Sequence, residues 1–228
     1  MDYSRIRDFV MSYSHDDTGL LKDIHDKALE KDVPIIRRET ADYLKVMLQI
    51  VRPKNVLEIG TAVAYSTLLI ADTLADVFGE NETPMYNAES AWSIDTCELD
   101  TDRITEARAN ISRSGYKSIN ILEGDAAETL HNIKDKEYDF IFIDAAKAQY
   151  KIYMEEAIRL SHPGTVIITD NILADGDVLE SHFLVEKRDR TIHDRMREYL
   201  YMIKNDDRLE TAILSVADGI AVSVVKKN

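Results

Sequence analysis

The sequence predicts an α/β fold built on a doubly wound, mostly parallel sheet. From residue 55 onward, short apolar runs alternate with amphipathic segments, as strands and crossover helices do in parallel sheets. Near the C-terminus, two further apolar runs are joined through Ala217 and Asp218, which indicates a hairpin. The last two strands are therefore expected to be antiparallel to each other.

The expected elements follow in chain order. Residues 1–52 should be helical, with two short helices within 1–32 and a third over 41–51 that ends before Pro53, because proline cannot continue a helix. The polar, turn-rich segment 78–92 is interpreted as a surface insertion, and residues 1–228 as a single domain. The remaining strands are expected near 55–59, 93–97, 119–123, 138–144, 164–169, 209–216 and 219–226, and the remaining helices near 64–77, 101–114, 127–133, 149–160 and 190–204.

Composition limits the classes of protein to consider. The 45% hydrophobic content is enough for a sizeable core, and the net charge of −14 disfavours nonspecific binding to nucleic acid or anionic membranes. No apolar run approaches the roughly 20 residues of a membrane span, and the N-terminus lacks a signal-peptide core, so a cytoplasmic protein without membrane contact is expected. Basic residues cluster within 37–54 and 187–197, where solvated helix faces and phosphate-binding surfaces remain open alternatives.

Polar side chains follow two neighbouring strands of the predicted sheet. Asp144 comes directly after the apolar run 140–143, and Asp170 and Asn171 follow the run 166–169. Their oxygen atoms are ligands of the kind that Mg²⁺ or Mn²⁺ prefers. None of the six histidines is spaced as a metal pair or as a partner of a nucleophile, so the sequence gives no support to a zinc site or a hydrolase triad.

Four short motifs carry a family resemblance. They are Glu58-x-Gly60, Gly124-Asp125-Ala126, Asp144 to Lys147, and Asp170-Asn171. With these motifs the stretch 33–226 resembles the metal-dependent O-methyltransferases that use S-adenosylmethionine, a class with catechol, caffeoyl-CoA and bacterial tRNA 5-hydroxyuridine methyltransferases. The resemblance implies a Rossmann-like class I methyltransferase fold with an antiparallel last strand. A dehydrogenase is disfavoured, because the turn after the first strand has one glycine instead of Gly-x-Gly-x-x-Gly.

The resemblance also implies how S-adenosylmethionine is bound. Glu98 is expected to accept hydrogen bonds from the ribose hydroxyls; Asp100 is the competing choice, and we assign it instead to the cap of the next helix. Asp125 and the backbone of Ala126 are expected at the adenine ring, and Ser66 at the methionine carboxylate. Further residues expected at the cofactor are Ile36, Glu58, Gly60 and Asp144.

The turn after the first strand departs from the family pattern Gly-x-x-x-Gly. Its second glycine is replaced by Ala64. A positive φ at this position would add strain of about 1 kcal/mol to an alanine, so we expect its backbone to stay in the ordinary region.

The resemblance further assigns the chemistry. Asp144, Asp170 and Asn171 are expected to bind Mg²⁺ or Mn²⁺, which lowers the pKa of an acceptor hydroxyl that it chelates. Asp144 thus has a catalytic role, and Lys147 is expected to act as a general base or as a cation that stabilises the alkoxide.

The acceptor is the most open question at this stage. The arginine-rich segment 188–197 and the last two strands look most like the tRNA-modifying branch, which predicts 5-hydroxyuridine at the wobble position of tRNA as the acceptor. The alternatives are a small catechol-like or caffeoyl-CoA-like molecule and, in another class, a noncatalytic protein that binds S-adenosylmethionine. A homodimer is expected.

Overall fold

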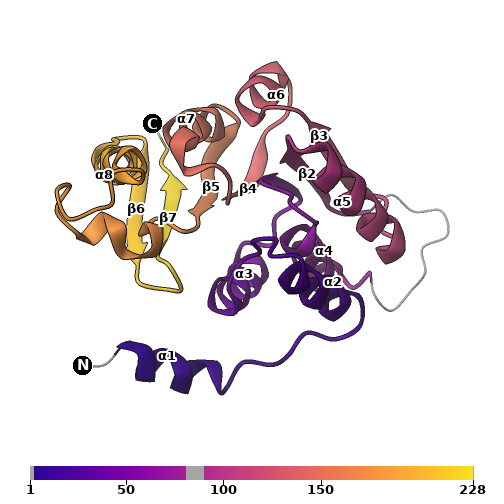
Figure 1. Ribbon diagram of the computed structural model, residues 1–228. Helices are drawn as coiled ribbons and strands as arrows, with labels where there is room; N and C mark the ends of the chain where they lie inside the picture. The colour runs from indigo at the N-terminus through magenta and orange to yellow at the C-terminus, as the bar shows by residue number, and fades with distance from the viewer. Residues whose placement is uncertain (1–2, 81–89, 228) are drawn as a thin grey trace.

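Seven strands form one mixed sheet at the centre of the computed structural model, which describes residues 3–80 and 90–227 (Figure 1). Their spatial order is β3-β2-β1-β4-β5-β7-β6. The strands are β1 (Asn55–Ile59), β2 (Ser93–Glu98), β3 (Ile119–Glu123), β4 (Tyr138–Ile143), β5 (Ser161–Thr169), β6 (Leu209–Leu214) and β7 (Ile220–Val225). The pairs β1–β2, β2–β3, β1–β4 and β4–β5 are parallel, whereas β7 is antiparallel to both of its neighbours. The predicted fold class is confirmed, including the antiparallel last strand.

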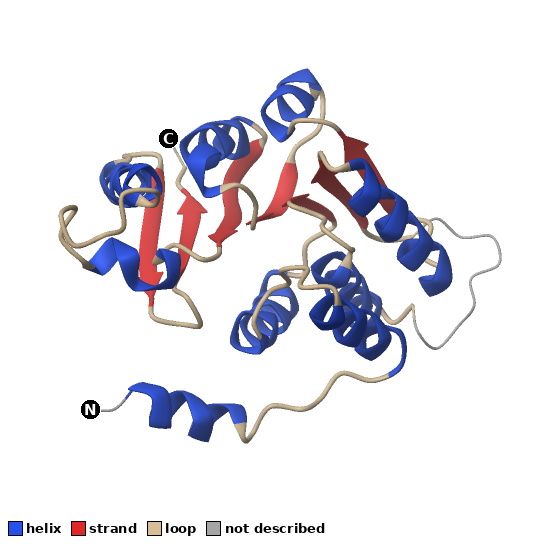
Figure 2. Cartoon of the chain, in the orientation of Figure 1, coloured by secondary structure: helices blue, strands red, loops and turns tan. Residues whose placement is uncertain are grey.

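Helices cover both faces of the sheet (Figure 2). One apolar core joins α2, α3, α4 and α5 to one face, and a second joins α6, α7 and α8 to the other. The helices are α1 (Tyr3–Met11), α2 (Gly19–Glu30), α3 (Arg38–Val51), α4 (Tyr65–Phe78), α5 (Thr101–Ser114), α6 (Ala126–Asn132), α7 (Tyr150–Arg159) and α8 (Arg190–Asn205), with 3₁₀ turns η1 (Lys147–Gln149) and η2 (Ala174–Leu179). Most of the insertion expected at 78–92 lies outside the described residues.

Local signals explain where several of these helices begin and end. Asp100 accepts hydrogen bonds from the backbone N–H groups of Asp102 and Arg103, as expected of the cap of α5. At the C-terminal end of α3, Arg52 adopts a left-handed conformation and Pro53 follows. Among the described residues, no helix is both long and apolar enough to cross a membrane.

The order of the strands determines where a ligand can bind. β1 lies between β2 and β4, so the crossover connections leave it in opposite directions along the sheet. In open α/β sheets, the crevice outside the carboxyl ends of the strands at such a switch point is the usual binding site. Here that crevice lies between Gly60, which follows β1, and Asp144, which follows β4.

Gly60 is the residue that permits the two strand ends to approach. Its φ is +111°, and a Cβ at this position would lie 2.0 Å from the backbone oxygen of Asp144. No side chain fits in that space. The group that Gly60 meets at close range is therefore the backbone of the Asp144 motif.

The expectation for Ala64 is wrong. Its φ and ψ are 66° and 27°, in the left-handed region, and the residue is fully buried as the N-cap of α4. The backbone must turn sharply from β1 into this buried helix, and the N–H of Ala64 closes the turn by donating to the carbonyl of Thr61 at 2.8 Å. The geometry of the turn therefore overrides the preference of alanine.

We predict that Ala64→Gly leaves stability equal or higher, because relief of left-handed strain offsets the extra entropy of glycine in the unfolded chain. The matched control is Ala71→Gly, which makes the same chemical change at an equally buried position inside α4. That control should lose about 1–2 kcal/mol. Urea unfolding measures both variants, and an equal loss in the two would contradict the strain at Ala64.

Candidate functional site

A cavity of about 750 Å³ lies at the carboxyl edge of the sheet, over the switch point. Its walls come from the segment before α3, the ends of β1, β2 and β4, and the turns after β3 and β5. The residues predicted for the site that line this cavity are Ile36, Gly60, Ser66, Glu98, Asp125, Ala126, Asp144, Lys147 and Asn171. Two predicted residues, Glu58 and Asp170, lie beneath the wall with exposed fractions of 0% and 1%.

Glu98 is held rigidly at the end of β2. Its Oε2 accepts from the N–H of Ala62 at 2.8 Å, and its Oε1 accepts from the N–H groups of Leu99 and Asp100 at 3.0 Å each. These bonds fix the carboxylate at the cavity wall, and Oε2, which accepts only one of them, still has a lone pair for a ligand hydroxyl. The side chain of Asp100 is directed instead at the start of α5.

Asp125 combines two tasks at the turn after β3. Its Oδ1 accepts from the N–H of Ala127 at 2.8 Å, which caps α6. The second carboxylate oxygen makes no bond of this kind within the described part of the chain, and Asp125 and Ala126 both line the cavity. Capping and ligand binding are therefore compatible at this residue.

Glu58 is a buried support of the turn after β1. Its Oε2 accepts from the hydroxyls of Thr67 and of Thr96, the latter at 2.6 Å. Burial raises the pKa of Glu58, and hydrogen bonds from Ser66, Thr67 and Thr96 oppose that rise. Glu58 does not line the cavity itself, but it is hydrogen-bonded to Ser66, which does.

Two carboxylates meet where β4 and β5 end. Asn171 bridges them, since its N–H donates to Asp170 Oδ1 at 2.8 Å and its Nδ2 donates to Asp144 Oδ1 at 3.0 Å. Burial, followed by the negative charge of Asp144, raises the pKa of Asp170 to about 7. Burial also raises the pKa of Asp144, which the charge of Lys147 opposes. A positive ion between the two carboxylates would relieve the repulsion that contributes to the raised pKa of Asp170.

Lys147 is positioned by a residue that sequence analysis missed. Its Nζ lies 3.9 Å from Asp218 Oδ2, and its side chain is 25% exposed at the cavity. Asp218 lies in the β6–β7 hairpin and is itself fixed by the N–H of Asp175, which donates to both of its carboxylate oxygens at 2.9 Å. In the sequence, Asp218 has only the appearance of a turn residue.

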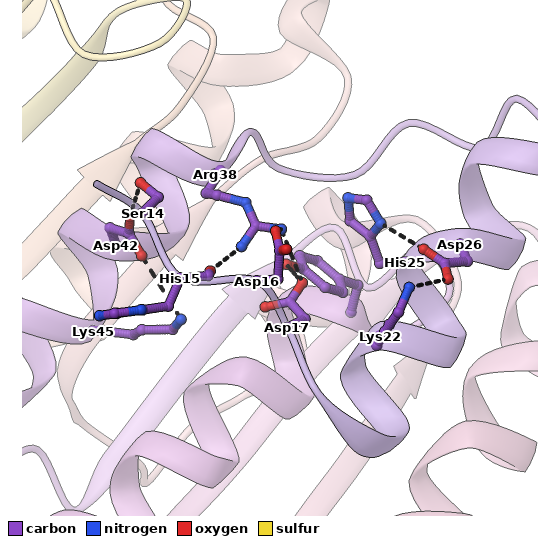
Figure 3. Close-up of polar contacts among 11 residues, drawn as sticks. Ser14, His15, Asp16, Asp17, Lys22, His25, Asp26, Arg38, Asp42 and Lys45 are labelled. Carbon is purple, nitrogen blue, oxygen red and sulfur yellow. Dashed lines mark hydrogen bonds and ion pairs between the residues drawn. The ribbon is translucent and has the colours of Figure 1, made fainter. Parts of the chain in front are cut away.

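Sequence analysis also missed residues of the N-terminal region. Thr40 of α3 donates to Asp170 Oδ1 at 3.2 Å and so supports the carboxylate pair from the far side. Tyr65 lines the cavity, and its hydroxyl donates to Asp17 Oδ2 at 2.7 Å. Arg38 lies 3.7 Å from Asp16 Oδ1 and 3.9 Å from Asp17 Oδ2 (Figure 3). The segment before α2 is thus tied to the start of α4 beside the cavity.

We predict that, without divalent cations, the free energy of unfolding decreases as pH rises between about 4 and about 7, by up to about 1.4 kcal/mol per pH unit from Asp170. The folded state keeps the proton of Asp170 up to a pKa of about 7, whereas an unfolded aspartic acid loses it near 3.9. The contribution is therefore complete at low pH and is lost as pH rises through the folded value.

Urea unfolding in EDTA across this pH range measures the effect. Asp170→Asn removes the titrating group and keeps the shape of the side chain, so its unfolding free energy should depend less steeply on pH. Identical pH profiles for the two proteins would show that Asp170 ionises normally in the folded state.

Comparisons with known proteins identify the family of the chain. The sequence model described as O-methyltransferase matches residues 11–227. A catechol O-methyltransferase of Niastella koreensis is 31% identical over 193 residues, which cover 81% of this chain and 79% of that protein. The structure of an O-methyltransferase from Bacillus cereus in complex with SAH superposes with a TM-score of 0.79 at 27% identity, covering 97% of each chain. The chain therefore belongs to the O-methyltransferase family and is an enzyme that uses S-adenosylmethionine.

Proposed function

We propose that the enzyme methylates one hydroxyl of a small catechol-like molecule in a reaction that requires Mg²⁺ or Mn²⁺. The observation that carries the proposal is the pair of carboxylates, Asp144 and Asp170, bridged by Asn171 at the edge of the cavity. Two adjacent hydroxyls on an aromatic ring match a metal site that has protein ligands on one side and open space on the other.

The donor set fits a hard cation. Asp144 and Asp170 provide carboxylate oxygens, and the carboxamide of Asn171 provides a neutral oxygen. Burial raises the pKa of both carboxyl groups, and the charge of Asp144 raises that of Asp170 further, so a nearby cation would stabilise their ionised forms. A bound Mg²⁺ would lower the pKa of an acceptor hydroxyl and orient it.

The walls of the cavity suit S-adenosylmethionine. Glu98 is placed to accept from the ribose hydroxyls, and Asp125 with the backbone of Ala126 to meet the adenine edge. Ser66 and Ile36 line the part of the cavity nearer to α3 and α4, where the methionine end would lie. This arrangement would place the methyl donor beside Asp144, within reach of an acceptor on the cation.

Lys147 is the group that we assign to stabilising the acceptor oxygen. Its Nζ belongs to the cavity wall, near Asp144 and 3.9 Å from Asp218. Asp218 holds the ammonium end in place, so that the charge of Lys147 can stabilise an acceptor oxygen after its proton leaves. Water in the open part of the cavity can receive that proton.

The surface charges favour a small acceptor over tRNA. Of the arginines that the sequence suggested for phosphate contacts, Arg188 pairs with Glu186 and Asp189, and Arg37 pairs with Asp175. The Niastella koreensis relative is a catechol O-methyltransferase. With a net charge of −14, binding of a polyanion would need arginines that are not paired with acids.

A tRNA acceptor, 5-hydroxyuridine, remains the second candidate because of one observation. Arg195 is exposed on α8, and its Nη1 donates to the backbone carbonyl of Ala148 at 3.2 Å. Ala148 neighbours Lys147, so Arg195 stands close to the cavity rim, where it would meet the backbone of a bound RNA.

We predict that Glu98→Ala weakens binding of S-adenosylhomocysteine by about 1–3 kcal/mol, because the ribose hydroxyls lose their acceptor. Asp100→Ala is the matched control. It removes a nearby carboxylate that caps α5, so it should lower stability by about 1 kcal/mol without changing affinity. Calorimetric titration measures both, and the reverse pattern would move the ribose role to Asp100.

Activity assays with labelled S-adenosylmethionine test the acceptor and the metal together. We expect methylation of a catechol with Mg²⁺, none in excess EDTA, and at least about a hundredfold lower kcat in Asp170→Asn with unchanged binding of S-adenosylhomocysteine. Full activity in EDTA would refute the metal. Methylation of total tRNA but not of catechol, lost on reversing the charge of Arg195, would establish the second candidate instead.

A further inference from the structure

Three metal-binding side chains meet at the start of α8, away from the cavity. The nitrogen and oxygen ligand atoms of His182, His193 and Asp194 all lie within 4.8 Å of one another. None of the three lines the cavity at the switch point. The spacing of the histidines in the sequence did not indicate this cluster. Ten intervening residues separate the two histidines in sequence, and the loop before α8 folds back to bring them together.

The hydrogen bonds of His193 cannot all be formed by a neutral ring. Its Nε2 lies 3.1 Å from the backbone carbonyl of Glu180, and its Nδ1 lies 2.8 Å from Asp194 Oδ1. Both partners are acceptors, but a neutral imidazole carries one N–H. With the proton on Nε2, the lone pair of Nδ1 faces a carboxylate oxygen, and a metal ion bound to both atoms would remove the repulsion between them.

His182 completes the same arrangement from the loop. Its Nδ1 lies 2.9 Å from the same oxygen, Asp194 Oδ1, and its ring centroid is 5.9 Å from that of His193. The side chain of His193 is only 2% exposed. A bound metal ion would be coordinated by both imidazoles in their neutral form.

We propose that His182, His193 and Asp194 bind a divalent transition metal, with Zn²⁺ the best match. Two imidazole nitrogens and one carboxylate oxygen are ligands that zinc favours, with a fourth position left to water. The bond from His193 Nε2 to the carbonyl of Glu180 is the second contact that a metal-bound histidine makes in most proteins. The Mg²⁺ site proposed above has oxygen ligands only, so the two sites differ in the ions that they select.

The ion would link the loop between η2 and α8 to α8 itself. At present that loop is held by side chains of α8 that donate to its backbone: Arg190 to the carbonyls of Phe183 and Val185, and Arg197 to the carbonyl of Glu180. His182 is the loop residue that would add a direct bond through the metal. The site is therefore structural, and its loss should appear in stability and not in the methyl transfer itself.

Zinc titration of the untagged, full-length protein after removal of metals tests the proposal. We expect one Zn²⁺ to bind and to raise the melting temperature. His182→Ala and Asp194→Asn should each weaken that binding by at least about tenfold. Both residues are partly exposed, so these variants should fold, which far-UV circular dichroism checks.

Two controls separate this site from other sources of zinc binding. His162→Ala removes a histidine of similar exposure that also pairs with an aspartate, Asp139, but belongs to no metal cluster among the described residues. It should leave the affinity unchanged, as should Asp170→Asn at the oxygen site. No zinc binding by the wild type, or binding that persists in His182→Ala and disappears in Asp170→Asn, would overturn the proposal.

Discussion

The site depends on one close contact, between Gly60 after β1 and the backbone of Asp144 after β4. A Cβ on Gly60 would lie 2.0 Å from the carbonyl oxygen of Asp144, and the N–H of Asp144 donates to the carbonyl of Ile59 at 2.9 Å. Strand pairing therefore continues to the last residue of both strands. As a result, the turn that we propose to face the methyl donor and the first carboxylate of the proposed metal site share one wall. A side chain at Gly60 would force these two parts of the proposed site apart.

This contact fixes Asp144 beside Asp170, so two carboxylates lie close together at a place where burial disfavours their ionised forms. Asp170 is buried and lies next to Asp144, and both its burial and the negative charge of Asp144 oppose the ionisation of Asp170. Thr40 and the N–H of Asn171 offset part of this cost through hydrogen bonds to Asp170. Neutral donors provide less compensation than a cation. A site that destabilises its own ionised form in this way should couple metal binding to folding, as buried metal sites generally do.

The sequence predicts most of the fold and the residues that follow strands, because both depend on local patterns. Asp144 could be found from the apolar run before it, and Asp100 from its place before a helix. Contacts between distant segments leave no such pattern. Thr40 contacts Asp170, which lies 130 residues away in the sequence. Asp218, in the hairpin near the C-terminus, lies close to Lys147. The prediction for the backbone of Ala64 was wrong for a different reason, since tertiary geometry imposes a left-handed conformation on a residue that disfavours it.

The two proposed cation sites should select different ions, because their ligand atoms differ. Asp144, Asp170 and Asn171 contribute only oxygen, which suits Mg²⁺ but discriminates poorly against other divalent ions. His182 and His193 add nitrogen ligands, for which zinc competes far better than magnesium. Zinc at low concentration should therefore go first to the cluster at α8, and only excess zinc should reach the oxygen site. The order in which zinc affects stability and activity thus follows from ligand type, independently of the acceptor.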